Sequence, residues 1–185
     1  MKSFTPQVTQ FLSSLTLIGG ILVIFMVSNL ILMRLFKITD LPLQKRLTRL
    51  LQNHGLLFAW IVAAIAMSGS LFYSDIAGYK PCILCWYQRI LMYPQVFILG
   101  LALIRKKKDV IPYALILAIP GLLIASFHYF EQITNNPLIP CTTIGYSVSC
   151  TEKFFFSYGY ITIPMMALTA FAMIILFLTY AQKKS

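Results

Sequence analysis

The feature that most constrains this chain is a series of five apolar blocks, each long enough to cross a lipid bilayer. The blocks cover residues 11–33, 55–74, 83–104, 110–130 and 160–180. At about 1.5 Å of rise per residue, some 20 helical residues cover the roughly 30 Å hydrocarbon core of a membrane. A helix satisfies its own backbone hydrogen bonds in lipid, so we expect five membrane-spanning helices and no soluble domain.

Charge is scarce, and its placement argues against a nucleic-acid-binding protein. Only 11% of the residues are charged, against roughly 25% in ordinary soluble domains. The net charge of +10 comes from short basic clusters between the apolar blocks, not from a basic face or arm that would follow a nucleic acid. We therefore expect no nucleic-acid partner.

The basic clusters predict how the chain is oriented in the membrane. Eleven of the 15 basic residues fall in alternate connections, which are expected to lie on one side: Arg34, Lys37, Lys45, Arg46, Arg49, Arg105, Lys106, Lys107, Lys108, Lys183 and Lys184. Basic connections face the cytoplasm, which places the N-terminus outside and the C-terminus inside. The first block is expected to be retained, because its 23 residues exceed a signal-peptide core and no small-x-small cleavage site follows.

All four cysteines fall at the opposite, outer side of the membrane. By position they form two pairs, Cys82 with Cys85 and Cys141 with Cys150. Disulfides form and persist in such a compartment. Cys82 and Cys85 form a Cys-x-x-Cys motif at the expected start of a helix, where free amides and the helix dipole stabilise a thiolate. A redox-active dithiol is therefore expected there.

Two other interpretations of the cysteines remain. Structural disulfides would suit Cys141 and Cys150, but a two-residue spacer closes too short a loop to restrain the unfolded chain much. A zinc site would use all four thiolates, yet the unequal spacings and the oxidising compartment disfavour it, so we expect no metal.

Arg89 adds a functional signal to the Cys-x-x-Cys motif. It follows Cys85 by four residues, so both project from the same helical face, one turn apart. A guanidinium inside the membrane edge is costly and marks a functional site, unless it only snorkels to the headgroups. Such a cation would stabilise the Cys85 thiolate and the negative charge that develops on a quinone oxygen during reduction.

Three segments resemble the DsbB family of disulfide-generating membrane oxidases, closest to its BdbC-type branch. They are PCILCWYQR at 81–89, CTEK at 150–153 followed by YGYITIP at 158–164, and His128-Tyr129 with Gln132. The resemblance covers roughly residues 55–181. It implies an all-α integral membrane protein, with an antiparallel four-helix transmembrane bundle in residues 51–185 and an extra N-terminal transmembrane helix and basic loop in residues 1–50.

The same resemblance implies a role for each candidate site residue. Cys141 would form the mixed disulfide with a thioredoxin-fold, DsbA-like oxidase, and Cys150 would pass electrons on through Cys82. Cys85 would form the thiolate that meets the quinone. Arg89 would bind the quinone, and His128 is a further candidate for the quinone site.

The expected activity is that of a multi-pass thiol:quinone oxidoreductase of a bacterial inner membrane, which reoxidises its partner and reduces ubiquinone or menaquinone. The vitamin K epoxide reductase family also combines quinones with cysteine pairs, but its loop pair precedes its Cys-x-x-Cys. An outward-directed reductant transporter would bury its cysteines within the membrane, and a non-enzymatic subunit would only cross-link loops. Phe154, Phe155 and Phe156 suit either a segment on the outer membrane surface, which would keep the two outer loops together, or the entry to the last helix.

Overall fold

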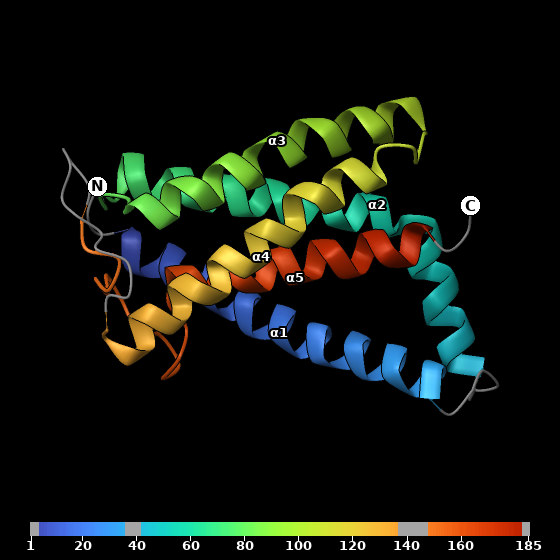
Figure 1. Cartoon of the computed structure of the whole chain (residues 1–185), viewed down its shortest axis with the longest axis horizontal. Helices are drawn as coiled ribbons and strands as arrows, with labels where there is room; N and C mark the ends of the chain where they lie inside the picture. Colours follow the sequence, from blue (N-terminus) through green and yellow to red (C-terminus); the bar gives the residue numbers. More distant parts are fainter. Residues whose placement is uncertain (1–3, 36–41, 137–147, 183–185) are drawn as a thin grey trace.

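The computed structural model describes residues 4–35, 42–136 and 148–182, which form an all-helical bundle (Figure 1). Its elements are α1 (Thr5–Leu35), α2 (Pro42–Leu71), the π-helical turn η1 (Phe72–Ile76), α3 (Ile83–Arg105), α4 (Ile111–Thr134) and α5 (Ile163–Gln182). Within these ranges, five helices are long and apolar enough to cross a membrane. The predicted all-α membrane fold with an extra helix is confirmed.

Consecutive helices alternate in direction, which gives the bundle two distinct ends (Figure 1). We call the end that holds Cys82, Cys85 and Cys150 the cysteine end, and the end that holds the turn 105–110 the basic end. Helix α5 contacts α1, α2 and α4, and α3 packs on α2 and α4. The core is therefore organised around α5, whose Phe171, Ile174 and Leu178 are fully buried.

Small residues allow the helices to approach closely around α5. A Cβ atom on Gly121 would overlap the Phe171 ring, and one on Gly55 would lie 2.5 Å from the Phe177 carbonyl oxygen. Lipid tails are as apolar as leucine, so membrane helices associate through such close packing and not through hydrophobic burial alone. Gly55 and Gly121 thus bring α2 and α4 against α5.

The helix bounds differ from the apolar blocks most clearly in α1, α2, α4 and α5. Helix α1 begins at Thr5, before residue 11. Helix α2 begins at Pro42, well before residue 55, because proline suits a first helical turn and the leucine, lysine and arginine residues that follow it favour helix. Helix α4 continues to Thr134 and ends at Asn135, in the left-handed conformation. Helix α5 starts only at Ile163, because Tyr158 and Gly159 have positive φ angles and Ser157 pairs with Ile161 in a tight turn.

Aromatic side chains hold the segment after Cys150 against the chain between α2 and α3. The rings of Tyr79 and Phe154 are stacked with centroids 4.5 Å apart, and Phe155 lies 5.5 Å from Tyr73. Phe156 is instead exposed beside the Lys153 ammonium. The phenylalanines are therefore not the entry to the last helix, and two of them keep the segments together, as the sequence suggested.

At the basic end, one lysine connects three elements. The Lys108 amine donates hydrogen bonds of 3.0 Å to the Gln52 carbonyl on α2 and to the Ala181 carbonyl near the end of α5. Cations near a helix C-terminus are favourable because free carbonyls gather there. Lys2, Lys37, Lys183 and Lys184 lie outside the described residues.

Candidate functional site

Cys82 and Cys85 lie at the start of α3, where the helix itself contacts a sulfur atom. Cys82 is the N-cap residue, with an extended backbone (φ −77°, ψ 172°). Its Sγ accepts a hydrogen bond of 3.3 Å from the Cys85 backbone amide and lies 3.0 Å from the Cys85 Sγ. Both residues are free cysteines. The N-cap position therefore gives Cys82 an amide donor that an ordinary cysteine lacks.

The surroundings of Cys82 favour its thiolate. The hydrogen bond from the Cys85 side chain is the largest cause that lowers the pKa of Cys82, to about 5, and a hydrogen bond from His128 adds to it. Burial acts in the opposite direction, because it disfavours charge. In the reduced pair the first negative charge thus falls on Cys82, at the end of the α3 dipole.

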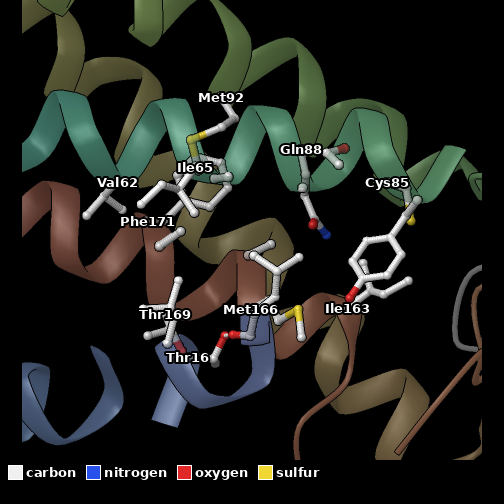
Figure 2. Close-up of a pocket in the computed structure, with 18 of the residues that line it drawn as sticks. Thr16, Val62, Ile65, Cys85, Gln88, Met92, Ile163, Met166, Thr169 and Phe171 are labelled. Carbon is white, nitrogen blue, oxygen red and sulfur yellow. Dashed lines mark hydrogen bonds between the residues drawn. The ribbon is translucent and has the colours of Figure 1, made fainter. Parts of the chain in front are cut away.

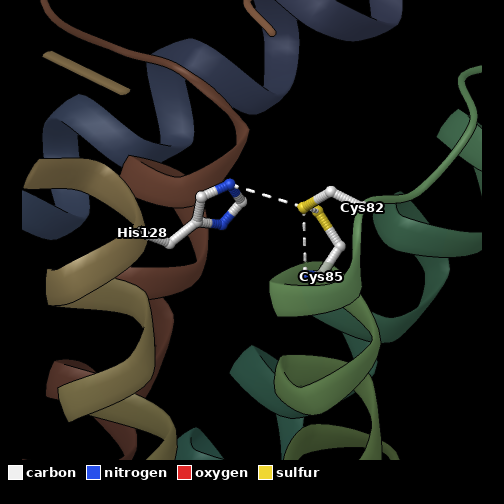
Figure 3. Close-up of side chains that lie close together, drawn as sticks. All are labelled: Cys82, Cys85 and His128. Carbon is white, nitrogen blue, oxygen red and sulfur yellow. Dashed lines mark hydrogen bonds between the residues drawn. The ribbon is translucent and has the colours of Figure 1, made fainter. Parts of the chain in front are cut away.

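His128 reaches Cys82 from α4 (Figure 3). Its Nε2 lies 3.5 Å from the Cys82 Sγ and 3.2 Å from the Cys150 carbonyl oxygen, and its Nδ1 lies 3.0 Å from the Gln88 amide nitrogen. A carbonyl oxygen only accepts hydrogen bonds, so Nε2 carries the proton and Nδ1 accepts from Gln88. His128 therefore presents an N–H group to the sulfur of Cys82.

Cys150 lies next to this group and completes it. Cys150 is 1% exposed, is disulfide-bonded, and forms a buried cluster with Cys82 and Leu84. The Gln132 amide donates a 2.7 Å hydrogen bond to the Glu152 carbonyl, which fixes the segment after Cys150 to α4. Cys141 lies outside the described residues. The structure thus places Cys150 beside Cys82, the sulfur through which the family resemblance implies that electrons would pass.

A cavity of about 340 Å³ begins on the other side of the cysteine pair (Figure 2). Cys85, Gln88 and Arg89 contribute to its wall, together with residues of α1, α2 and α5. Small-molecule sites in proteins are mostly apolar clefts of about 300–1,000 Å³ with a few polar groups. Cys82 and His128 are not among the described residues that line the cavity. Cys82 thus faces Cys150, and Cys85 faces the cavity.

Arg89 is held inside the cavity wall by two neighbours. Its guanidinium donates a hydrogen bond of 3.2 Å to the Ser70 carbonyl on α2 and lies 5.3 Å from the centre of the Trp86 ring. The Tyr93 hydroxyl donates to the Ser70 hydroxyl at 3.0 Å. These contacts fix a cation one helical turn from Cys85, where it faces the same cavity.

The ligand atoms of Cys82, Cys85 and His128 all lie within 4.8 Å of one another. Such a trio has the atoms of a partial metal site, but the same distances are those of a hydrogen-bonded dithiol beside a histidine donor. The hydrogen bond from the Cys85 amide to Cys82 and the contact of Gln88 with His128 both favour the hydrogen-bonded dithiol.

Gln88 is the residue that sequence reasoning missed. It is 6% exposed, contacts His128 and also lines the cavity. A signal was present, because Gln88 is a polar residue one turn after Cys85 within an apolar helix. No feature of the sequence indicated that α1 takes part in the cavity wall.

Sequence similarity to known proteins covers most of the chain. Residues 52–181 match the family described as "Disulfide bond formation protein DsbB". This chain belongs to the DsbB family. The match includes α3, α4, nearly all of α5 and most of α2.

Individual relatives of this DsbB-family chain are bacterial proteins with the same described role. "Disulfide bond formation protein C" of Bacillus subtilis is 46% identical over 122 residues, which cover 65% of this chain and 86% of the relative. A "Probable disulfide formation protein" of Oceanobacillus iheyensis is 42% identical over 70% of this chain and 89% of its own length. One from Coxiella burnetii is 37% identical over 136 residues, 72% of this chain and 91% of the relative. No solved structure matches the chain.

The family and the membrane helices together establish a coarse function. The protein is a multi-pass membrane disulfide oxidoreductase of the BdbC-type branch, with a role in disulfide bond formation.

Proposed function

We propose that this protein is a thiol:quinone oxidoreductase that takes electrons from a thioredoxin-fold, DsbA-like oxidase and passes them to a respiratory quinone. The observation that carries the proposal is the position of the Cys-x-x-Cys pair. Cys82 contacts the buried Cys150 cluster, whereas Cys85 lines the cavity that also holds Arg89. The two sulfurs thus connect a disulfide on one side with a ligand-sized space on the other.

The first steps are thiol–disulfide exchanges. A partner thiolate attacks the Cys141–Cys150 disulfide at Cys141 and releases the Cys150 thiolate. That thiolate attacks a Cys82–Cys85 disulfide at Cys82 and releases Cys85. The second partner thiol then frees Cys141, which attacks Cys150 and releases Cys82. The balance is one partner disulfide formed and one Cys82–Cys85 dithiol left.

Cys82 is suited to be the leaving sulfur of the last exchange. A sulfur with a low thiol pKa leaves faster, and the α3 amide and the His128 N–H both stabilise the Cys82 thiolate. The free Cys82 and Cys85 together with a disulfide-bonded Cys150 correspond to the state just before electrons leave the protein.

The cavity provides for the final transfer. A quinone bound there would accept two electrons and two protons and become a quinol, while Cys82 and Cys85 return to a disulfide. Arg89 would orient a quinone oxygen and stabilise negative charge on it, one turn from the Cys85 sulfur. We propose His128 as a second residue of the quinone site through Gln88, which its ring contacts and which lines the cavity.

The proposed setting is a bacterial cytoplasmic membrane with the cysteine end outside. The basic end then faces the cytoplasm, in keeping with the usual bias of lysine and arginine. Residues 51–185 form the redox bundle in this proposal, and residues 1–50 add one crossing and a basic connection. Ubiquinone and menaquinone both present a carbonyl oxygen to a single cation, so either is a substrate by this chemistry.

The test is anaerobic quinone reduction by the purified protein with a reduced thioredoxin-fold oxidase. Wild type should reduce quinone and oxidise the partner in equal amounts, and Cys82→Ser and Cys85→Ser should each abolish both. Phe97→Leu, a change on the same helix at a residue that is 68% exposed and outside the cavity lining, should stay active. A non-enzymatic subunit would show no turnover in wild type, and that result would refute the proposal.

A further inference from the structure

Helix α1 precedes the region that matches the DsbB family, yet it forms part of the cavity wall beside Cys85 and Arg89. Leu12, Leu15, Thr16, Gly19 and Leu22 all line this space, and the family match begins only at residue 52. We propose that α1 forms a binding wall for the isoprenoid tail of the quinone. This inference rests on the proposed quinone reaction and assigns the tail-binding part of that site.

The cavity changes in polarity along its length. At one end lie the Cys85 thiol, the Gln88 amide and the Arg89 guanidinium. Thr16 and Thr169 lie on the side away from Cys85 (Figure 2), and each hydroxyl donates to a carbonyl of its own helix, at 2.8 and 2.9 Å. The hydrogen-bonding capacity of these hydroxyls is therefore used within their own helices, and the residues that line the cavity beside them, such as Leu15, Val62 and Ile65, are aliphatic. A ligand with a polar head and an apolar chain matches this gradient.

The extent of the cavity suits more than a headgroup. Its wall on the second crossing runs from Tyr73 back to Val62, which corresponds to about 16 Å of helix at about 1.5 Å per residue. Ile18 and Leu22 line the cavity but are also 54% and 42% exposed. This edge therefore borders the lipid-facing surface, from which an isoprenoid chain would enter.

A glycine determines how closely α1 approaches α5 along this wall. A Cβ atom on Gly19 would lie 2.8 Å from the Met173 sulfur and 3.1 Å from the Thr169 methyl carbon. The adjacent Gly20 has nothing within 4 Å of the same added atom. A side chain at position 19 would thus enter the narrow part of the wall, and one at position 20 would not.

These two glycines provide a matched test in the full-length protein. Gly19→Leu and Gly20→Leu raise helix propensity equally, but only the first places its side chain between α1 and α5. A second pair avoids the helix contact: Leu22→Trp fills the cavity edge, whereas Ile24→Trp changes a residue that is 69% exposed and lies elsewhere on α1. All four variants should fold, because the Met173 side chain is flexible and tryptophan is tolerated near lipid.

The measurement is equilibrium binding of two radiolabelled quinones to protein in lipid nanodiscs, with concentrations expressed per lipid. One quinone carries an isoprenoid tail and the other lacks a tail. Gly19→Leu and Leu22→Trp should weaken binding of the tailed quinone about tenfold, with little change for the tailless one. Gly20→Leu and Ile24→Trp should match wild type for both.

The possible results distinguish a failure of the α1 assignment from a failure of the proposed quinone reaction. If wild type binds the tailed quinone and all four variants bind it equally well, the α1 assignment is wrong while the quinone reaction stands. An equal loss for both quinones in the lining variants would also overturn it, because the wall would then hold the headgroup. If wild type binds neither quinone, the proposed reaction itself fails.

Discussion

The two ends of the bundle use polar side chains in opposite ways. At the cysteine end, Gln88, His128 and Gln132 are buried and connect different elements to one another, around two free thiols. At the basic end, buried residues such as Leu51, Ile111 and Tyr180 are largely apolar, and Lys108 donates to backbone carbonyls. Buried polar groups cost free energy unless they are hydrogen-bonded, so their concentration at the cysteine end is in keeping with the site that we propose there.

Replacing one arginine at each end should give the largest difference in quinone KM between the two ends. Arg89→Ala removes the cavity cation that lies one helical turn from Cys85, and it should raise the apparent KM for quinone by about tenfold to a hundredfold, the value of a charged hydrogen bond. Partner exchange should be retained. Arg105→Ala, at the basic end, should leave both unchanged. Steady-state kinetics with varied quinone would check this, and a wild-type KM in Arg89→Ala would remove Arg89 from the site.

The two histidines of the chain lie at opposite ends of the bundle, and only His128 should affect the Cys82 thiolate. His128→Ala removes an N–H donor from the Cys82 thiolate, so the pKa of Cys82 should rise from about 5 toward the range of an ordinary cysteine. In wild type the thiolate is lost only as the pH falls through about 5, whereas the variant should lose it at higher pH. Electron transfer from Cys150 at neutral pH should slow by about tenfold.

Thiolate absorbance across a pH titration of the reduced protein would measure the pKa of Cys82 directly. His54→Ala is the control, because His54 contacts Phe58 and lies at the basic end. An identical titration in wild type and His128→Ala would show that the α3 amide and Cys85 alone stabilise the thiolate.

A smaller effect should follow from loosening the aromatic contacts at the cysteine end. Tyr79→Ala removes stacking on Tyr73 and Phe154, and aromatic pairs contribute about 0.5–1.5 kcal/mol each beyond burial. The segment after Cys150 would then be held less firmly, and exchange with Cys82 should slow by about threefold. Tyr113→Ala, 65% exposed on α4, serves as the control in single-turnover measurements. Equal rates would show that Gln132 suffices to hold the segment.

The smallest effect on activity should come from Lys108. Lys108→Ala removes two charge-assisted hydrogen bonds and should lower the free energy of unfolding by about 1–3 kcal/mol. Quinone KM and partner exchange should not change in the variant that remains folded. Thermal denaturation in detergent, with Lys107→Ala as the control, would measure the loss of stability. A change in quinone KM would mean that the ends are not independent.

The amino-acid sequence by itself predicts the five membrane crossings. It also predicts that Cys85 and Arg89 project from the same helical face. Helical periodicity and the thickness of the bilayer decide both, and each depends only on residues close together in the chain. The contacts of Cys82 with Cys150 and His128, and the place of α1 in the cavity wall, follow only from the way the helices pack. Hydropathy cannot reveal these contacts, because lipid is as apolar as a leucine side chain and a lipid-facing surface looks like a packed one. Close approaches such as Gly121 against Phe171 decide which faces meet.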